Sequence, residues 1–493
     1  MRHHAAFELP PRINAAGRYI GAAVYGFTAL FFAVVGALCA VKLCASHGSV
    51  FTALLTLALF AALCCALWLV PNKKAALAFV LALAAALRVW YVFTVPGEPV
   101  SDFALLYSSA ESAANGDFSW ANVTEGYFAW WRYQVPFVLY EAAVIRFTHS
   151  VAALKLVNVV WSVGTVYLVH RITRTFAGDK AALAAGLFAA VCPAFIMYSS
   201  VLTNQHISLF FILLGLAVFI EARSFPACAA AGALMALGNL MRPEAAIVVA
   251  AVCCAALYVF ISDPSKKSLA HIVANLAAAL VCYFAVQKAA ELILAALGWA
   301  SYGIGNSAPE WKLIVGLDIE SGGTVSQKYA ALLDIADPAE RSSAIRAVIA
   351  AQLAEVVKYP AFFFEKLKYF WTSAEDVTFT LAGVPEWATA FGAVSVPNMV
   401  YTLSSCEFAL RTAAYLLAAL FCALSAKDSA LGRFKSASAA PVCVAAVICG
   451  TLLAYLFIEI QPRYRFFALP FVFILAAAAV GRIAPDGKRT WKK

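Results

Sequence analysis

Asp102 is the first residue in this chain whose type and position suggest chemistry. It lies in a polar stretch, residues 95–137, that opens where a long apolar run ends. A carboxylate just outside a membrane span can accept the proton of a hydroxyl group that reacts at the bilayer surface. The run that follows it, FALLYSSAESAA, is amphipathic and would fix Asp102 near that surface. We therefore expect Asp102 to be a general base; the alternative for any acid in such a loop is a solvated surface charge.

Two arginines are candidates for binding an anion. Arg242 and Arg463 each follow an apolar run and stand beside a proline that stops the helix. Charges at the edge of apolar spans are costly unless they are paired or wetted, and they usually mark a site or an anchor. Two guanidinium groups can hold a phosphate through bidentate hydrogen bonds. The alternative is that both arginines reach lipid headgroups, with Glu244 and Glu459 as their salt-bridge partners.

Further polar residues in the same segments are weaker candidates for substrate binding. Glu125 precedes an aromatic cluster, and His206 stands at a helix start, where a lone histidine is more often a cap or a donor than a metal ligand. The other candidates are Tyr133, Asn204, Glu244 and Tyr464. No phosphate-binding loop, dinucleotide fingerprint, HExxH or GxSxG motif occurs, so nothing points to a nucleotide substrate or a hydrolase nucleophile.

Composition places these residues in a membrane protein. The chain has 493 residues, of which 63% are hydrophobic and 13% charged, and its mean hydropathy is +0.83. A soluble domain would have about 45–50% apolar and about 25% charged residues. Runs of about 20 apolar residues cross the bilayer as helices, because their backbone must be satisfied internally. We predict an all-α polytopic membrane protein with two large extracytoplasmic loops that contain interfacial helices.

About twelve transmembrane helices, within a range of 11–13, fit the apolar runs. Residues 134–147 are short and could form a thirteenth span or a helix lying in the interface. Basic residues favour short cytoplasmic loops, and they all fall on one side only if this stretch does not cross. We therefore expect it not to cross. The predicted spans begin near Tyr19, Ser49, Ala75, Val151, Lys180, Gln205, Pro226, Pro243, Ser268, Tyr401, Ser438 and Pro462.

This topology puts both termini in the cytoplasm and explains the net charge of +9 without a nucleic-acid-binding face. The first apolar run is too long for a cleaved signal peptide, so we expect it to be the first span. The thirteen cysteines lie in or beside apolar spans and are expected to be free. The basic residues predicted on the cytoplasmic side are Arg2, Arg12, Arg18, Lys73, Lys74, Arg171, Arg174, Lys180, Arg223, Lys266, Lys267, Lys427, Arg433, Lys435 and the tail GKRTWKK.

Three modules follow from the predicted spans. Residues 1–298 form an N-terminal transmembrane module whose first outer loop, at about 96–150, carries Asp102. Residues 299–398 form an outer loop or cover with an amphipathic helix over 339–357, which is ended or kinked at Pro360 and has an aromatic end suited to the water–lipid interface. Residues 399–493 hold the last transmembrane helices and the basic tail.

The order of the motifs is similar to a known family. The segments are SDFALLYSSAESAANGDF, YQVPFVLYEAAVIRF, LKLVNVVWSVGTVYLVHRITRTFAGDKAALAAGLFAAVCPAFIMYSSVLTNQHISLFF, GALMALGNLMRPEAA and EIQPRYRFFALPFVFILAA. They span most of residues 96–245 and a short stretch near the C-terminus. Together they resemble the polyprenyl-phosphate-dependent membrane glycosyltransferases of the type C (GT-C) superfamily. More narrowly, they resemble the protein O-mannosyltransferase and aminoarabinose transferase group (glycosyltransferase families 39 and 83).

The resemblance implies an inverting transfer of a sugar from a polyprenyl-phosphate donor to a glycan, lipid or protein acceptor on the outer face. By position, Asp102 matches the family's first-loop catalytic aspartate, and Arg242 and Arg463 match positions where basic residues meet the lipid phosphate. The chain departs from the pattern in having one proline, Pro136, where the family often has a pair. It also has Thr203-Asn204-Gln205-His206 where the family often has an acidic residue, which leaves the metal site and the acceptor class open.

The expected partners are therefore the lipid-linked sugar donor, the acceptor and membrane lipids, in the plasma membrane and without nucleic acid. No organic cofactor is expected; a divalent metal is compatible with the family but not indicated by the residues. The rival from another class is a transporter or flippase of a lipid-linked glycan precursor, which should show related halves and polar groups at mid-membrane depth. No internal repeat is visible, and the polar groups gather on one face. A membrane ligase or polymerase for surface glycans shares the chemistry of the transferase.

Overall fold

The computed structural model describes residues 9, 13–45, 47–222, 224–262, 266–306, 308–385, 390–391, 394–433 and 438–484. The described chain is almost entirely helical, apart from a two-stranded antiparallel pair, β1 (Ala390–Phe391) and β2 (Val394–Ser395). Five of the predicted cytoplasmic basic sites lie outside the described residues: Arg2, Arg12, Arg223, Lys435 and the tail GKRTWKK.

Long apolar helices make up most of the described structure. By length and composition, eight of them can cross a membrane: α1 (Ala15–Ala45), α2 (His47–Leu69), α3 (Lys73–Thr94), α7 (Val151–Ala177), α12 (Ala245–Ser262), α13 (Lys266–Ala296), α18 (Val396–Ala430) and α19 (Ala440–Phe457). Three apolar helices are shorter: α10 (Gln205–Glu221), α11 (Phe225–Met241) and α20 (Leu469–Ile483). A broken span combines α8 (Asp179–Val191) with α9 (Pro193–Met197) and η3 (Tyr198–Ser200), with a bend of 49°.

These helices confirm the predicted all-α polytopic fold. Each predicted span starts within a few residues of one of them, or, for the last span, of the turn that leads into α20. Length and composition alone qualify eight spans in the described chain, or up to ten if each bent helix pair counts as one. The cysteines are all free, as expected.

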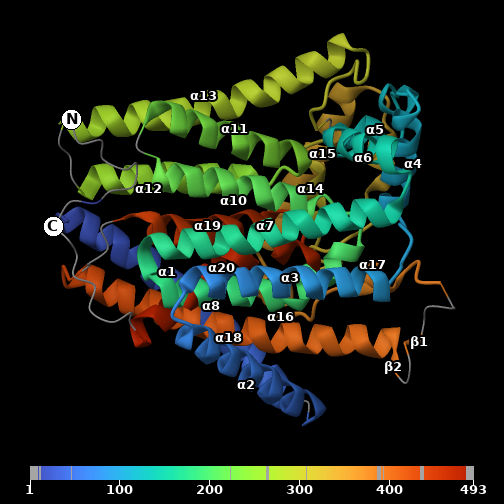
Figure 1. Cartoon of the computed structure of the whole chain (residues 1–493). Coiled ribbons are helices and arrows are strands. Elements are labelled where there is room, and N and C mark those ends of the chain that lie inside the picture. Colours follow the sequence, from blue (N-terminus) through green and yellow to red (C-terminus); the bar gives the residue numbers. More distant parts are fainter. Residues whose placement is uncertain are drawn as a thin grey trace.

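Most of the remaining short elements gather at one end of the helix bundle, where Figure 1 labels α4, α5, α6, α15 and α17. The short elements are α4 (Asp102–Ala114), η1 (Ser119–Ala121), α5 (Tyr127–Trp130), η2 (Arg132–Gln134), α6 (Val135–Thr148), α14 (Trp311–Gly316), η4 (Ala330–Asp334), α15 (Pro338–Val356), α16 (Ala361–Thr372), α17 (Thr378–Leu381) and η6 (Pro462–Phe467). The opposite end holds the start of α1 and the end of α20. There the Ser429 hydroxyl donates to the Arg18 carbonyl, and Arg482 pairs with Asp428. The bundle therefore has one polar end built from loops and one end where α1 and α20 both contact the end of α18.

Residues 134–147 form a helix that stays at the loop end. This helix, α6, packs against α4, and Arg146 Nη1 donates a hydrogen bond of 2.6 Å to the Ala114 carbonyl. Lys155, near the start of α7, donates to the Gly97 carbonyl just beyond α3. The end of α3 and the start of α7 thus lie on the same side of the bundle. This arrangement agrees with the expectation that the stretch does not cross.

A buried arginine supports the break between α8 and α9. Pro193 has no N–H to donate to the carbonyl of Ala189, so the helix cannot continue through it. Arg88 of α3 is fully buried and donates to the carbonyls of Ala189 and Ala190 at 2.9 and 2.8 Å. Its Nε also donates to the Ser162 hydroxyl at 2.7 Å. Arg88 thus supplies the donors that the broken backbone needs in an apolar environment.

The predicted amphipathic helix is α15, and the chain turns by 102° between it and α16, around Pro360. The expectation of an interfacial aromatic end is only partly right: Tyr359 and Tyr369 are exposed, but Trp371 is fully buried against α1. Arg411 donates to the Trp371 carbonyl at 2.6 Å, which satisfies a backbone group in the last turn of α16.

Candidate functional site

A cavity of about 590 Å³ opens at the loop end of the bundle, and both large loops and three helix-end turns line it. It collects most of the residues singled out from the sequence. Those at its wall are Asp102, Tyr133, Asn204, Arg242, Glu244, Arg463 and Tyr464. The residues come from segments far apart in the chain, so only the fold brings them together.

Asp102 is the first residue of α4 and is exposed in the cavity wall. Ser101 before it has φ 55° and ψ −135°, a backbone conformation that non-glycine residues rarely adopt. Such strain costs about 1–3 kcal/mol and persists where the surrounding structure fixes it, often at functional sites. The carboxylate also stands at the N-terminus of α4, the positive end of the helix dipole. The turn therefore presents an ionisable carboxylate to the cavity.

Arg242 lies in the turn between α11 and α12 and is held on two sides. Its Nε donates to Glu244 Oε1 at 2.8 Å and its Nη1 donates to Asn204 Oδ1 at 3.2 Å. The expected Arg242–Glu244 pair is confirmed. Burial is the largest effect and lowers the pKa of Arg242, but Glu244, Tyr464 and Tyr455 together outweigh it and raise that pKa above its usual value. The guanidinium stays charged, with Glu244 balancing part of its charge.

Arg463 is held by aromatic and amide groups. Its guanidinium carbon lies 4.4 Å from the centre of the Phe379 ring, and its Nε donates to Gln461 Oε1 at 2.6 Å. The backbone is fixed by Gln205, whose Nε2 donates to the Arg463 carbonyl at 2.9 Å. Among the described residues it forms no ion pair with a carboxylate. Arg463 thus offers the cavity a positive charge that no described carboxylate pairs with directly.

Lys312, in the second large loop, is a cation that also lines the cavity. It was not among the candidates identified from the sequence. Its Nζ forms an ion pair with Glu459 Oε2, and the Glu459 N–H donates to the Lys312 carbonyl at 2.8 Å. The expectation that Glu459 pairs with Arg463 is therefore wrong. The reason is geometric: α14 folds back over the turn after α19 and reaches Glu459 first. The only sequence signal for Lys312 was a lone lysine between Trp311 and an aliphatic run.

The electrostatics of this pair favour its charged form. Glu459 is only 4% exposed, and burial raises the pKa of its carboxyl. Lys312, with smaller contributions from Gln461 and Arg463, outweighs that effect, so the pKa of Glu459 lies below its usual value. Burial lowers the pKa of Lys312 in turn, but Tyr464 and Glu459 raise it above its usual value. Both groups therefore stay ionised near neutral pH.

Two candidates do not reach the cavity. Glu125 is exposed in the first large loop and is not part of the cavity wall. His206 is 1% exposed and lies edge-on to Phe466, with ring centres 4.9 Å apart. Its neighbour Asn204 does reach the cavity, and donates to Gln134 Oε1 at 3.1 Å and to the Met241 carbonyl at 2.9 Å.

Metal-binding residues are not clustered in the described part of the chain: no group of three or more His, Cys, Asp or Glu side chains lies close enough together to hold an ion. The arrangement at the cavity can accept a proton at Asp102 and bind an anionic group at Arg463. Arg242 and Lys312 add positive charge that Glu244 and Glu459 partly balance.

One comparison with known proteins bears on this geometry. A family model described as dolichyl-phosphate-mannose-protein mannosyltransferase matches residues 136–287. The matched segment contains Asn204, Arg242 and Glu244 but neither Asp102 nor Arg463. No curated protein matches the chain. The match and the apolar helices support the resemblance to GT-C enzymes and a membrane glycosyltransferase of the mannosyltransferase type.

Proposed function

We propose that the protein transfers a sugar from a polyprenyl-phosphate donor to an acceptor hydroxyl at the extracytoplasmic face, with inversion at the anomeric carbon. The observation that carries this proposal is the shared cavity: Asp102 and Arg463, from opposite ends of the chain, line the same space at the loop end of the bundle. A base and a phosphate-binding cation are the two groups that such a transfer needs.

In the proposed reaction the acceptor oxygen attacks the anomeric carbon of the donor. The bond from that carbon to the phosphate oxygen breaks, and its electron pair leaves with the lipid phosphate. Asp102 takes the proton of the acceptor hydroxyl. Arg463 stabilises the charge that builds on the leaving phosphate, and Arg242 assists. No organic cofactor enters this scheme.

The phosphate site follows from the balance of charge at the cavity. Arg242 and Lys312 each have a carboxylate partner, whereas Arg463 contacts Phe379 and Gln461. A cation that is partly shielded from water and has no carboxylate partner interacts strongly with an incoming anion. Tyr133, Asn204, Glu244 and Tyr464 are proposed to contact the donor or the acceptor. Residues 1–298 and 399–493 are proposed as the membrane modules and 299–398 as the cover that supplies Lys312.

The proposed orientation places the loop end outside and both termini in the cytoplasm of the plasma membrane. It rests on the lysine and arginine residues at the opposite end, such as Arg171, Arg174 and Arg482. This side also suits the chemistry, because the hydrocarbon tail of the donor keeps its phosphate at the rim of the bilayer.

The rival is transport of the same lipid-linked precursor, and one experiment separates the two. Purified protein in liposomes receives radiolabelled polyprenyl-phosphate mannose together with a membrane extract as the source of acceptors. The proposed function predicts that label moves into a product that no longer partitions with the donor lipid. Movement of intact donor between leaflets, with no product in any extract fraction, would contradict the transferase and favour transport.

A further inference from the structure

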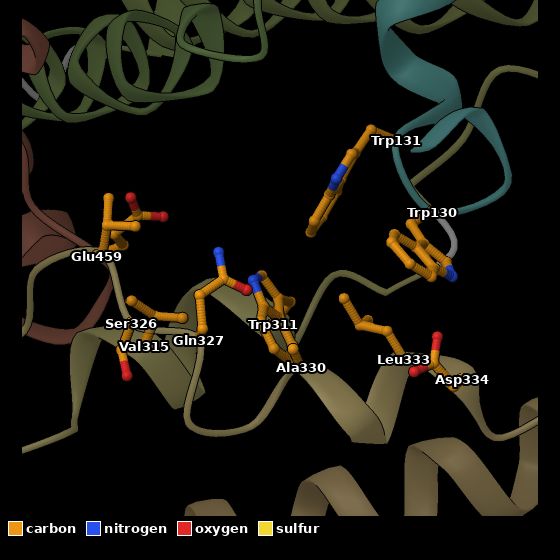
Figure 2. Close-up of a pocket in the computed structure, with 11 residues that line it drawn as sticks. Trp130, Trp131, Trp311, Val315, Ser326, Gln327, Ala330, Leu333, Asp334 and Glu459 are labelled. Atoms are coloured by element: carbon orange, nitrogen blue, oxygen red, sulfur yellow. The ribbon is translucent and has the colours of Figure 1, made fainter. Parts of the chain in front are cut away.

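A second pocket, of about 300 Å³, adjoins the cavity and is lined by three tryptophans (Figure 2). They are Trp130, Trp131 and Trp311. The pocket shares Trp131, Val325, Gln327 and Glu459 with the larger cavity, so the two spaces lie next to each other. A ligand in the pocket would therefore lie beside the space that Asp102 lines.

Both outer loops build this pocket. Trp130 is the last residue of α5, and Trp131 follows it directly, whereas Trp311 is the first residue of α14. Figure 2 shows Trp130 and Trp131 on the side of the first outer loop, facing Trp311 and Gln327 from the second. The Trp311 ring packs in a small apolar cluster with Leu333, so its position is fixed. The pocket is thus an ordered wall of aromatic rings.

Polar groups stand among these rings. Asp334 and Gln327 are exposed at the pocket, and Glu459 lines the part that it shares with the cavity. Carboxylate and amide groups accept and donate hydrogen bonds in fixed directions. Aromatic faces with a few convergent polar groups are typical of small-molecule sites, and about 300 Å³ is at the lower end of their range.

The residues that line the tryptophan pocket favour a sugar ring over an isoprenoid tail or a phosphate. A pyranose ring has a face of C–H groups that packs on an aromatic ring, and hydroxyl groups around its rim that bond to carboxylates and amides. An isoprenoid tail would leave Asp334 and Glu459 facing hydrocarbon, which is costly. A phosphate would be repelled by the exposed Asp334 carboxylate, whereas the charge of Glu459 is balanced by Lys312. A neutral sugar ring therefore fits the lining best.

We propose that this tryptophan pocket binds a neutral sugar ring of the acceptor, so that the acceptor is a glycan. This inference rests on the proposed function and deepens it, because it selects among glycan, lipid and protein acceptors. The acceptor ring lies between the tryptophans and directs a hydroxyl past Trp131 toward Asp102.

Sugar binding tests the pocket without any turnover. Full-length protein in nanodiscs is mixed with methyl α-D-mannopyranoside or methyl β-D-glucopyranoside, and binding is followed by saturation-transfer NMR. The variants are Trp130→Ala and Asp334→Asn, two residues that line the tryptophan pocket but not the larger cavity. We expect wild type to bind at least one glycoside and each variant to bind it about tenfold or more weakly. Trp130→Tyr should restore much of the affinity, and the exposed Glu355→Gln on α15 should bind as wild type.

Two outcomes overturn the proposal. One is that wild type binds neither glycoside, or that both variants bind as tightly as wild type. The other is that a serine- and threonine-containing hexapeptide binds instead and loses affinity in Trp130→Ala, which would assign the pocket to a protein acceptor. Failure of the proposed function is distinguishable: sugar would then still bind, and Asp102→Asn would leave that binding unchanged, while no sugar moved from any polyprenyl-phosphate donor.

Discussion

Lys312 and Glu459 are joined twice, by an ion pair between their side chains and by a hydrogen bond from the Glu459 N–H to the Lys312 carbonyl at 2.8 Å. The first residue belongs to the second outer loop and the second to the turn between α19 and η6. This double link fastens the outer loop over the cavity. It also balances the charge of Lys312, so that Arg463 presents the uncompensated charge among the described cations of the cavity.

The pair should be coupled energetically. Lys312→Met leaves the buried Glu459 without its cation and should destabilise the protein by about 3–5 kcal/mol. Glu459→Gln should cost less, and the double variant should be more stable than the sum of the single effects by about 1–3 kcal/mol. Thermal unfolding of the four proteins in nanodiscs measures this. The exposed pair Lys368–Glu365 is the control, with an expected coupling below about 0.5 kcal/mol. Strict additivity at Lys312 and Glu459 would contradict the link.

The two arginines of the cavity should differ in their effect on the donor. Arg463→Gln removes the uncompensated charge and should lower kcat/KM for the polyprenyl-phosphate donor by about 100-fold or more. Arg242→Gln should have a smaller effect, because Glu244 already balances Arg242. Steady-state kinetics at varied donor concentration compares them, with Arg171→Gln, at the other end of the bundle, as the control. A larger loss in Arg242→Gln would place the phosphate nearer that residue.

Arg88 should contribute strongly to folding. Arg88→Met leaves the carbonyls of Ala189 and Ala190 without donors, and each buried unsatisfied group costs about 1–3 kcal/mol. We expect a clear fall in the thermal unfolding temperature. Arg171→Gln breaks the more exposed ion pair with Glu221 and should cost less than about 1 kcal/mol. Equal stability of the two variants would show that the backbone break does not need Arg88.

Because of Lys366, we expect the free energy of unfolding to depend on pH above pH 7. Burial lowers the pKa of Lys366 in α16 from 10.5 to about 7, and the charge of Glu459 opposes this only in part. Between these pH values the unfolded chain holds more protons than the folded one, so the free energy of unfolding rises with pH. The slope should approach about 1.4 kcal/mol per pH unit from pH 7 upward and should be absent below pH 7.

Lys366→Met should abolish this slope, whereas Lys368→Met, on the same helix, should keep it. Unfolding temperatures from pH 6 to pH 10 give the comparison. A wild-type protein that loses stability over this range, or a variant with an unchanged slope, would contradict the lowered pKa. The amine donates to the Gly316 carbonyl at 2.5 Å and to the Leu456 carbonyl at 3.1 Å, so the variant also removes two hydrogen bonds at every pH.

The sequence predicts the membrane helices well because each one depends on the composition of its own segment. Apolar runs of sufficient length must be helical in lipid, and the basic residues around 134–147 indicate that this stretch does not cross. Asp102, Arg242 and Arg463 could be identified as candidates from the sequence for the same reason, since each is a charge at the end of an apolar run. The resemblance to GT-C enzymes then gave these charges a common role.

The rest depends on long-range contacts that no local pattern encodes. Lys312 reaches the cavity only because α14 folds over the turn after α19, so its pairing with Glu459 was not foreseen. His206 and Asn204 are near neighbours in one turn, yet one side chain packs on Phe466 and the other lines the cavity. The tryptophan pocket combines two outer loops and is invisible in either alone.

The central claim, that Asp102 is the base, is tested most directly by the Asp102→Asn variant in nanodiscs. The measurement is the rate of sugar transfer from a saturating polyprenyl-phosphate donor, with donor affinity and unfolding temperature determined in parallel. Loss of the base should lower kcat by about 100-fold or more, with donor affinity and stability near wild type. Glu111→Gln, on the same helix, should transfer at the wild-type rate. An Asp102→Asn variant that transfers sugar as fast as wild type would contradict the account.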